Sequence, residues 1–184
     1  MGRSLLLFVF VIAAFFKMTS PLASETSQES IKQKTGNTII YLVRHAEKVT
    51  TDPQDEDPEL TAAGFKRAED LKQFLKNEDI DAFFTTPYKR NQLTLSPVAQ
   101  GRKLLVYDAH DFKQLKERIL RDYKGKTVLV VGHSNTLLPI IEAFGGKKPM
   151  TQITDSQYDN IFKLTISSQG KVQVEAQKFG VQSA

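Results

Sequence analysis

The sequence predicts an α/β fold with a mostly parallel central sheet that is flanked by helices on both faces. Short apolar runs of strand length alternate with segments of helical periodicity from residue 38 to about residue 146. Helical connections of this kind join parallel strands, which become covered on both sides. Two later apolar runs are separated only by a turn, which predicts a C-terminal hairpin at the edge of the sheet.

Six apolar segments are predicted to be strands. The first, TIIYLVRH, is rich in β-branched and aromatic residues, as buried strands are. The hairpin between the last two turns at Gln169 and Gly170. The predicted strands are residues 38–45, 81–86, 103–108, 127–133, 162–168 and 171–179.

Four segments are predicted to be helices from the spacing of their apolar residues. Thr61 and Asp111 are plausible N-terminal caps, Pro97 is expected to kink or shorten the second helix, and glycines close the fourth. The acidic segment 49–60, with two prolines, reads as a solvated loop. The predicted helices are residues 60–77, 88–100, 111–124 and 135–146.

The N-terminal residues 1–23 have the layout of a signal peptide. Arg3 precedes an apolar run of 12 residues, Leu5 to Phe16, and small residues follow near Ala23. This run is shorter than the ~20 residues of a membrane-spanning helix, so we expect cleavage and a secreted or periplasmic protein. The alternative is an uncleaved N-terminal membrane anchor.

The polar residues 24–36 are predicted to be a flexible lead-in, and residues 37–184 a single domain. The chain has no cysteine, which excludes disulfides and a cysteine nucleophile. Its net charge of +4 is not concentrated in a basic block, so no nucleic-acid partner is expected. The sequence leaves the oligomeric state open.

Chemically active residues cluster at the carboxyl ends of the predicted strands. Arg44 and His45 end the first strand, Arg90 follows the second, Asp108 ends the third and His133 ends the fourth. Ligands of open α/β sheets bind outside these strand ends. The sequence therefore directs two arginines, two histidines and one acid toward a single edge of the sheet.

This set of residues suits a phosphate group. Guanidinium groups match phosphate oxygens with paired donors. Ser134 and Asn135 are expected to open a helix whose free N–H groups add to anion binding. A neutral imidazole can attack phosphorus and form a phosphohistidine, provided that an acid protonates the leaving alcohol. A small phosphorylated substrate is the expected partner.

Three motifs together resemble the histidine phosphatase superfamily, whose fold is phosphoglycerate-mutase-like. They are LVRHAEK at 42–48, PYKRNQLT at 87–94 and VVGHSNT at 130–136, and the segment 60–71 is similar to the first helix of the family. The likeness extends from residue 38 to about residue 145. The chain has no room for a large helical insertion, which places it beside the small single-domain members.

The resemblance implies a role for each motif residue. His45 would be the nucleophile, Arg44 and Arg90 would clamp the phosphate, and His133 would donate to the transferring group. Ala46 departs from the glycine that commonly follows the histidine. No metal or organic cofactor is expected, because the arginines supply the positive charge and would repel cations.

The general acid is the least determined role. Asp108 is the first choice, because the family often places the acid after the third strand, and His110, Asp111 and Glu47 remain open. Asp108 could instead cap the next turn, and Glu47 could form a solvated pair with Lys48. The expected substrate contacts are Glu47, Lys48, Ser134 and Asn135.

Two other functions remain open beside an exported phosphatase. The alanine at position 46 and the undetermined acid favour a phosphate- or phosphoglycan-binding module without catalysis. A phosphomutase is the third possibility, although the chain is shorter than a typical mutase.

Overall fold

The computed structural model describes Gly2 and residues 36–183. The predicted signal peptide, 1–23, and the predicted lead-in, 24–36, lie outside the described residues except for Gly2 and Gly36. No helix in residues 36–183 has the length and apolar character that crossing a membrane requires.

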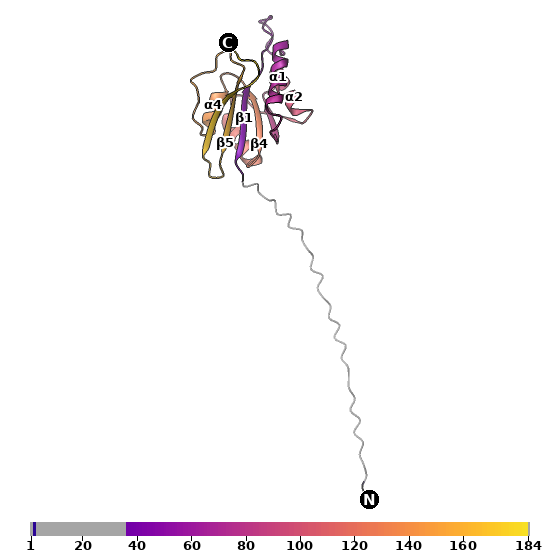
Figure 1. Cartoon of the computed structure of the whole chain (residues 1–184), viewed down its shortest axis with the longest axis vertical. Coiled ribbons are helices and arrows are strands. Elements are labelled where there is room, and N and C mark those ends of the chain that lie inside the picture. The colour runs from indigo at the N-terminus through magenta and orange to yellow at the C-terminus, as the bar shows by residue number, and fades with distance from the viewer. Residues whose placement is uncertain (1, 3–35, 184) are drawn as a thin grey trace. The chain divides into compact units, whose positions relative to one another are not determined.

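Residues 36–183 fold into strands and helices that alternate as the sequence predicts (Figure 1). The predicted α/β fold class is therefore confirmed. In chain order the elements are β1 (Thr38–Arg44), α1 (Ala62–Phe74), β2 (Ala82–Thr85), α2 (Lys89–Ala99), β3 (Leu104–Val106), α3 (Phe112–Asp122), β4 (Thr127–Gly132), α4 (Leu137–Ala143), β5 (Asn160–Ile166) and β6 (Val172–Lys178).

The six strands form one sheet in the order β3-β2-β4-β1-β5-β6. β3, β2, β4 and β1 are parallel to one another, whereas β5 is antiparallel to both β1 and β6, and the β5–β6 hairpin closes one edge. β1 lies inside the sheet, between β4 and β5. Arg44 pairs with Gly132 in the β1–β4 register, so the next residues, His45 and His133, leave the sheet side by side.

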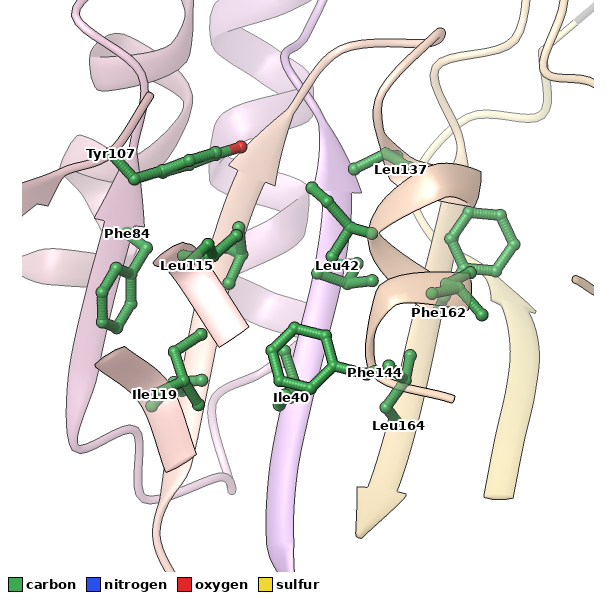
Figure 2. Packing of buried hydrophobic residues seen from close by; sticks show 14 of the residues in the cluster. Ile40, Leu42, Phe84, Tyr107, Leu115, Ile119, Leu137, Phe144, Phe162 and Leu164 are labelled. Carbon is green, nitrogen blue, oxygen red and sulfur yellow. The ribbon is translucent and has the colours of Figure 1, made fainter. Parts of the chain in front are cut away.

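Both faces of the sheet are buried beneath helices. Ile40 and Leu42 of β1 pack on the face that α3 and α4 cover (Figure 2). Tyr41 and Val43 alternate to the opposite face, where side chains of α1 and α2 cover them. This period of two with apolar residues on both sides explains why the sequence of β1 is almost continuously apolar.

The predicted helix caps are confirmed. Thr61 Oγ1 accepts a hydrogen bond of 3.1 Å from the backbone N–H of Gly64, and the Asp111 carboxylate accepts one of 2.8 Å from that of Gln114. Pro97, however, does not end α2, which continues to Ala99. The missing N–H of a proline in the last turn removes only one helical hydrogen bond.

The predicted start of the fourth helix is wrong. The carbonyl of His133 accepts from the N–H groups of Thr136 and Leu137, at 3.0 and 3.2 Å, so residues 133–136 form a turn. α4 begins only at Leu137, and Ser134 and Asn135 precede it instead of opening it. The predicted closure by glycines is confirmed, since Gly145 adopts a positive φ of 90° just after the helix.

Candidate active site

His45 follows β1 and is held in one tautomer. Its backbone N–H donates to the Gly132 carbonyl at 3.0 Å, which continues the pairing with β4. Its side chain is only 4% exposed, and Nδ1 lies 2.8 Å from the Ala46 carbonyl oxygen. A carbonyl only accepts hydrogen bonds, so Nδ1 carries the proton and Nε2 carries the lone pair. This is the tautomer that a nucleophile requires.

Burial also keeps the imidazole of His45 neutral. Desolvation lowers its pKa to about 3, and the positive charges of Arg44 and Arg90 act in the same direction. The hydrogen bond to the Ala46 carbonyl opposes this shift but is outweighed. At neutral pH the lone pair of Nε2 is therefore available for attack.

A second, half-buried imidazole lies beside the first. The ring centres of His45 and His133 are 5.5 Å apart, with an angle of 67° between the ring planes. His133 Nε2 shares a hydrogen bond of 3.2 Å with the hydroxyl of Thr86 at the end of β2. Burial lowers the pKa of His133 to about 4, with Arg90 and Arg44 contributing in the same direction. Both imidazoles are thus neutral at pH 7.

Arg44 is oriented by a loop that lies between α4 and β5. Its Nη1 donates to the carbonyl oxygens of Thr154, Asp155 and Gln157 at 3.0, 3.0 and 3.1 Å. Its guanidinium carbon lies 4.1 Å from the ring centre of Tyr158. These contacts engage one side of the guanidinium, whereas Nε is buried without a hydrogen-bond partner.

Arg90 lies in the first turn of α2 and also has buried N–H groups without hydrogen bonds, on Nε and Nη1. Its guanidinium stacks over the ring of Tyr88 at 4.2 Å. The Asp57 carboxylate lies 3.8 Å from Nη1, within ion-pair range but too far for a hydrogen bond. Buried donors without acceptors are costly, and an anion would satisfy them.

The acidic segment 49–60 was expected to be a solvated loop, but only part of it lies in solvent. Residues 51–56 are exposed, but the Asp57 carboxylate accepts a hydrogen bond of 2.9 Å from the backbone N–H of Lys89. That carboxylate therefore caps the start of α2 beside Arg90.

A cavity of about 310 Å³, here called the phosphate cavity, opens at this edge of the sheet. It brings together six of the predicted site residues, whereas Arg44, Asp108 and Glu47 are not among the residues that line it. None of the described residues that line it carries a carboxylate. The lining residues are His45, Lys48, Tyr88, Arg90, Ala109, His110, His133, Ser134, Asn135 and Thr136.

Glu47 does not form the expected solvated pair with Lys48. Its two carboxylate oxygens share the single Nε–H of Arg67, at 2.9 and 3.0 Å from Nε, and one of them lies 2.7 Å from Nη2. Arg67 is itself buried and donates to the carbonyl of Val181 at 3.0 Å. The helical spacing of Arg67 from the buried Leu71 was a signal that it faces inward.

Asp108 lies on an exposed turn after β3. Its carboxylate accepts a hydrogen bond of 2.8 Å from the backbone N–H of His110, as in the turn-capping alternative. It lines an adjoining cavity instead of the phosphate cavity. His110 lines both cavities, and Asp111 caps α3. The role of Asp108 as proton donor stays a prediction.

Sequence reasoning missed the side chains that support the peptide after His45. Thr94 Oγ1 accepts from the backbone N–H of Ala46 at 2.9 Å and donates to the carbonyl of Arg90 at 2.7 Å. Nδ2 of the buried Asn91 lies 3.2 Å from the Gly132 carbonyl that accepts from His45. The helical spacing of Asn91 and Thr94 would have placed both on the inner face of α2.

Residues 36–183 contain no group of three histidine, aspartate or glutamate side chains that could hold a metal ion. The expectation that the site works without a metal remains a prediction.

Comparison with known proteins identifies the family. The model of the histidine phosphatase superfamily (branch 1) matches residues 40–127, a segment that contains Arg44, His45 and Arg90. The solved structure of the protein histidine phosphatase SixA with tungstate has a TM-score of 0.62 and 17% identity, covering 76% of this chain and 96% of that one. No curated protein matches the chain in sequence.

Two other solved structures share this fold. Phosphoserine phosphatase from Entamoeba histolytica, in complex with 3-phosphoglyceric acid, has a TM-score of 0.60 and 15% identity, covering 79% of this chain and 98% of that one. The alpha-ribazole phosphatase from Shigella flexneri has a TM-score of 0.56 and 19% identity, covering 78% and 99%. Residues 40–127 therefore belong to the histidine phosphatase superfamily, branch 1, and residues 36–183 have the phosphoglycerate-mutase-like fold.

Proposed function

We propose that this protein hydrolyses phosphate monoesters through a phosphohistidine that forms on His45. One observation carries the proposal: a buried, neutral imidazole with Nε2 unprotonated shares a cavity with the guanidinium of Arg90, whose buried N–H groups lack acceptors. The imidazole that we propose as nucleophile and the guanidinium donors that we propose as anion ligands thus lie at the same strand ends.

The chemistry follows from these groups. Nε2 of His45 attacks phosphorus, and the free donors of Arg90 and Arg44 stabilise the phosphoryl oxygens as charge moves onto them. In this proposal His133, which is neutral and lies 5.5 Å from His45 between ring centres, donates to the same group. Water then hydrolyses the phosphohistidine and restores the free imidazole. The positive charge comes from the arginines, so the reaction proposed here uses no metal.

The test is the substitution His45→Asn with an aryl phosphate as substrate. Loss of the nucleophile should lower kcat by about 10⁴-fold or more. Wild-type protein quenched during turnover should carry an acid-labile, base-stable phosphate, which the variant lacks. A circular dichroism spectrum equal to that of the wild type would show that the variant is folded. Turnover by His45→Asn within tenfold of the wild type would refute the phosphohistidine route.

A phosphate-binding module without catalysis is the second candidate. The observation that favours it is the lack of a carboxylate among the described residues that line the phosphate cavity. An aryl phosphate with a good leaving group separates the two functions, because its departure hardly needs an acid. Binding of this ester without release of the phenol would establish the module.

We also propose that the enzyme is exported, on the grounds of the apolar run from Leu5 to Phe16 and the small residues near Ala23. Expression of the full chain followed by mass spectrometry of the protein outside the cytoplasm tests this. A mature N-terminus near residue 24 is expected. Recovery of the intact N-terminus in the membrane fraction would favour the anchored alternative.

A further inference from the structure

A second cavity adjoins the phosphate cavity. Its volume is about 380 Å³, and the two cavities share Tyr88, Ala109 and His110. We call it the side cavity. Ligand cavities of enzymes commonly start at about 300 Å³, so the space is large enough to hold an organic group. The residues that line it are Pro87, Tyr88, Val106, Tyr107, Asp108, Ala109, His110 and Gln114.

The wall of the side cavity contains apolar side chains that are exposed and do not pack in the core. Val106, the last residue of β3, is 53% exposed, and Tyr88 is 38% exposed. Both rank among the exposed large hydrophobic residues of the described chain, and Pro87 beside them is exposed as well. Apolar side chains that remain in solvent next to a polar reaction site are typical of a surface that contacts a ligand.

The side chains between the two cavities contact the proposed catalytic residues. The ring of Tyr88 stacks on the guanidinium of Arg90 at 4.2 Å and meets the ring of His133 edge-on at 5.5 Å. On the other side, the Asp108 carboxylate fixes the backbone N–H of His110 at 2.8 Å. A group in the side cavity would thus lie beside the phosphate in a fixed geometry.

The other candidate acids are engaged elsewhere. Glu47 is paired with Arg67, and the Asp111 carboxylate caps α3. The Asp108 carboxylate accepts from His110 and lines only the side cavity. Among the described histidine, aspartate and glutamate residues, His110 alone lines both cavities, and an imidazolium is an effective proton donor near neutral pH.

We propose that the side cavity holds the leaving group of the substrate, a ring-bearing alcohol, and that His110 donates the proton that the ester oxygen needs. This inference rests on the proposed phosphatase function and specifies its substrate class. The two cavities are continuous, and the side cavity has an exposed apolar and aromatic wall on which a ring packs better than a short polar chain, so a ring-bearing leaving group fits best.

The two transfer steps balance. In the first, Nε2 of His45 forms the P–N bond, the P–O bond to the leaving group breaks, and the proton of the His110 imidazolium passes to the departing oxygen to give the alcohol. In the second, neutral His110 takes a proton from water as the water oxygen bonds to phosphorus. The P–N bond then breaks and its electron pair returns to Nε2, leaving phosphate and the starting enzyme.

The subsite is tested with 2-phenylethyl phosphate and ethyl phosphate, whose leaving groups are both primary alcohols. We expect the wild type to have the higher kcat/KM for the ring-bearing ester. Val106→Asp should lower the ratio of the two kcat/KM values by about tenfold, since apolar contacts give discrimination of this order. The matched control is Val181→Asp, because Val181 is 67% exposed and lines neither cavity. A ratio that Val106→Asp leaves unchanged would overturn the subsite.

The proton donor is tested with His110→Asn on 2-phenylethyl phosphate and p-nitrophenyl phosphate. The variant should lose about 10²–10³-fold in kcat on the alkyl ester and less than about fivefold on the nitrophenyl ester, whose phenolate leaves without a proton. A structural defect would instead affect both esters alike, and equal losses would overturn the role of His110.

The outcomes distinguish a failure of the subsite and proton donor from a failure of the phosphatase function. If the wild type releases nitrophenol and forms an acid-labile phosphoenzyme while the variants fail to separate the esters, only the subsite and the proton donor are refuted. If the wild type releases phosphate from none of these esters, the phosphatase function falls, and this proposal falls with it.

Discussion

The buried imidazole of His45 should make the fold sensitive to mild acid. Its pKa lies at about 3 in the folded protein, because burial disfavours the charged form, whereas a histidine in an unfolded chain titrates near 6.5. Below pH 6.5 the unfolded chain therefore binds a proton that the folded protein does not take up. The free energy of unfolding falls as the pH drops from about 6.5 to about 3.

The size of this effect at pH 4.5 depends little on how low the folded pKa lies. At 1.36 kcal/mol for each of the two pH units below 6.5, His45 contributes a loss of about 2.7 kcal/mol. His45 stays neutral in the folded protein at pH 4.5, because its folded pKa of about 3 lies well below that pH. That is a large part of the 5–15 kcal/mol that typically stabilises a domain.

Urea unfolding of the wild type and of His45→Asn measures the effect. The loss between pH 7 and pH 4.5 should be about 2–3 kcal/mol larger in the wild type, because the carboxylates and His133 are common to both proteins. Between pH 7 and pH 8 the two proteins should change alike, which serves as the internal control. Equal losses at pH 4.5, or an NMR titration of His45 centred near 6.5, would refute the reasoning.

Three substitutions probe the support of the site. Thr94→Val removes the hydroxyl that accepts from the Ala46 N–H, and it should lower kcat by about tenfold, equivalent to about 1.4 kcal/mol in the barrier. Thr94→Ser keeps a hydroxyl and should retain the wild-type kcat. An equal loss of kcat in Thr94→Ser would count against this role. Gly64→Ala places a Cβ against the Glu47 carbonyl and should lower the free energy of unfolding by about 1–3 kcal/mol, although alanine is the better helix former; greater stability in urea would contradict the contact. Arg67→Met leaves the Glu47 carboxylate without its partner and should cost about 2 kcal/mol in urea unfolding at neutral pH, whereas Arg67→Lys, which keeps the positive charge, should cost less; equal losses in the two variants would argue against the ion pair.

The sheet and the gathering of the site at one edge could be predicted because both follow from local patterns. β1 is covered on both faces, so its apolar residues form an almost continuous run that ends at Arg44. In a parallel sheet the carboxyl ends of the strands meet at the same edge, so the residues after β1, β2 and β4 had to converge there.

The remaining features depend on contacts that leave little trace in local sequence. Arg44 is held by three backbone carbonyls, and any residue type supplies a carbonyl. Glu47 pairs with Arg67, which lies 20 positions away, whereas the sequence suggested the adjacent Lys48 as its partner. The late start of α4 follows from a backbone turn at His133, which competes with the helix for the same carbonyl.

The hydrogen bonds that orient Arg44 come from a segment far downstream in the sequence. The carbonyls that hold it lie 110 to 113 positions downstream, and β5, which flanks β1, begins only at Asn160. A chain still emerging from the ribosome contains Arg44 and His45 early but lacks both these carbonyls and the neighbouring strand β5. The folded arrangement of Arg44 beside His45 therefore depends on synthesis of the chain past residue 160.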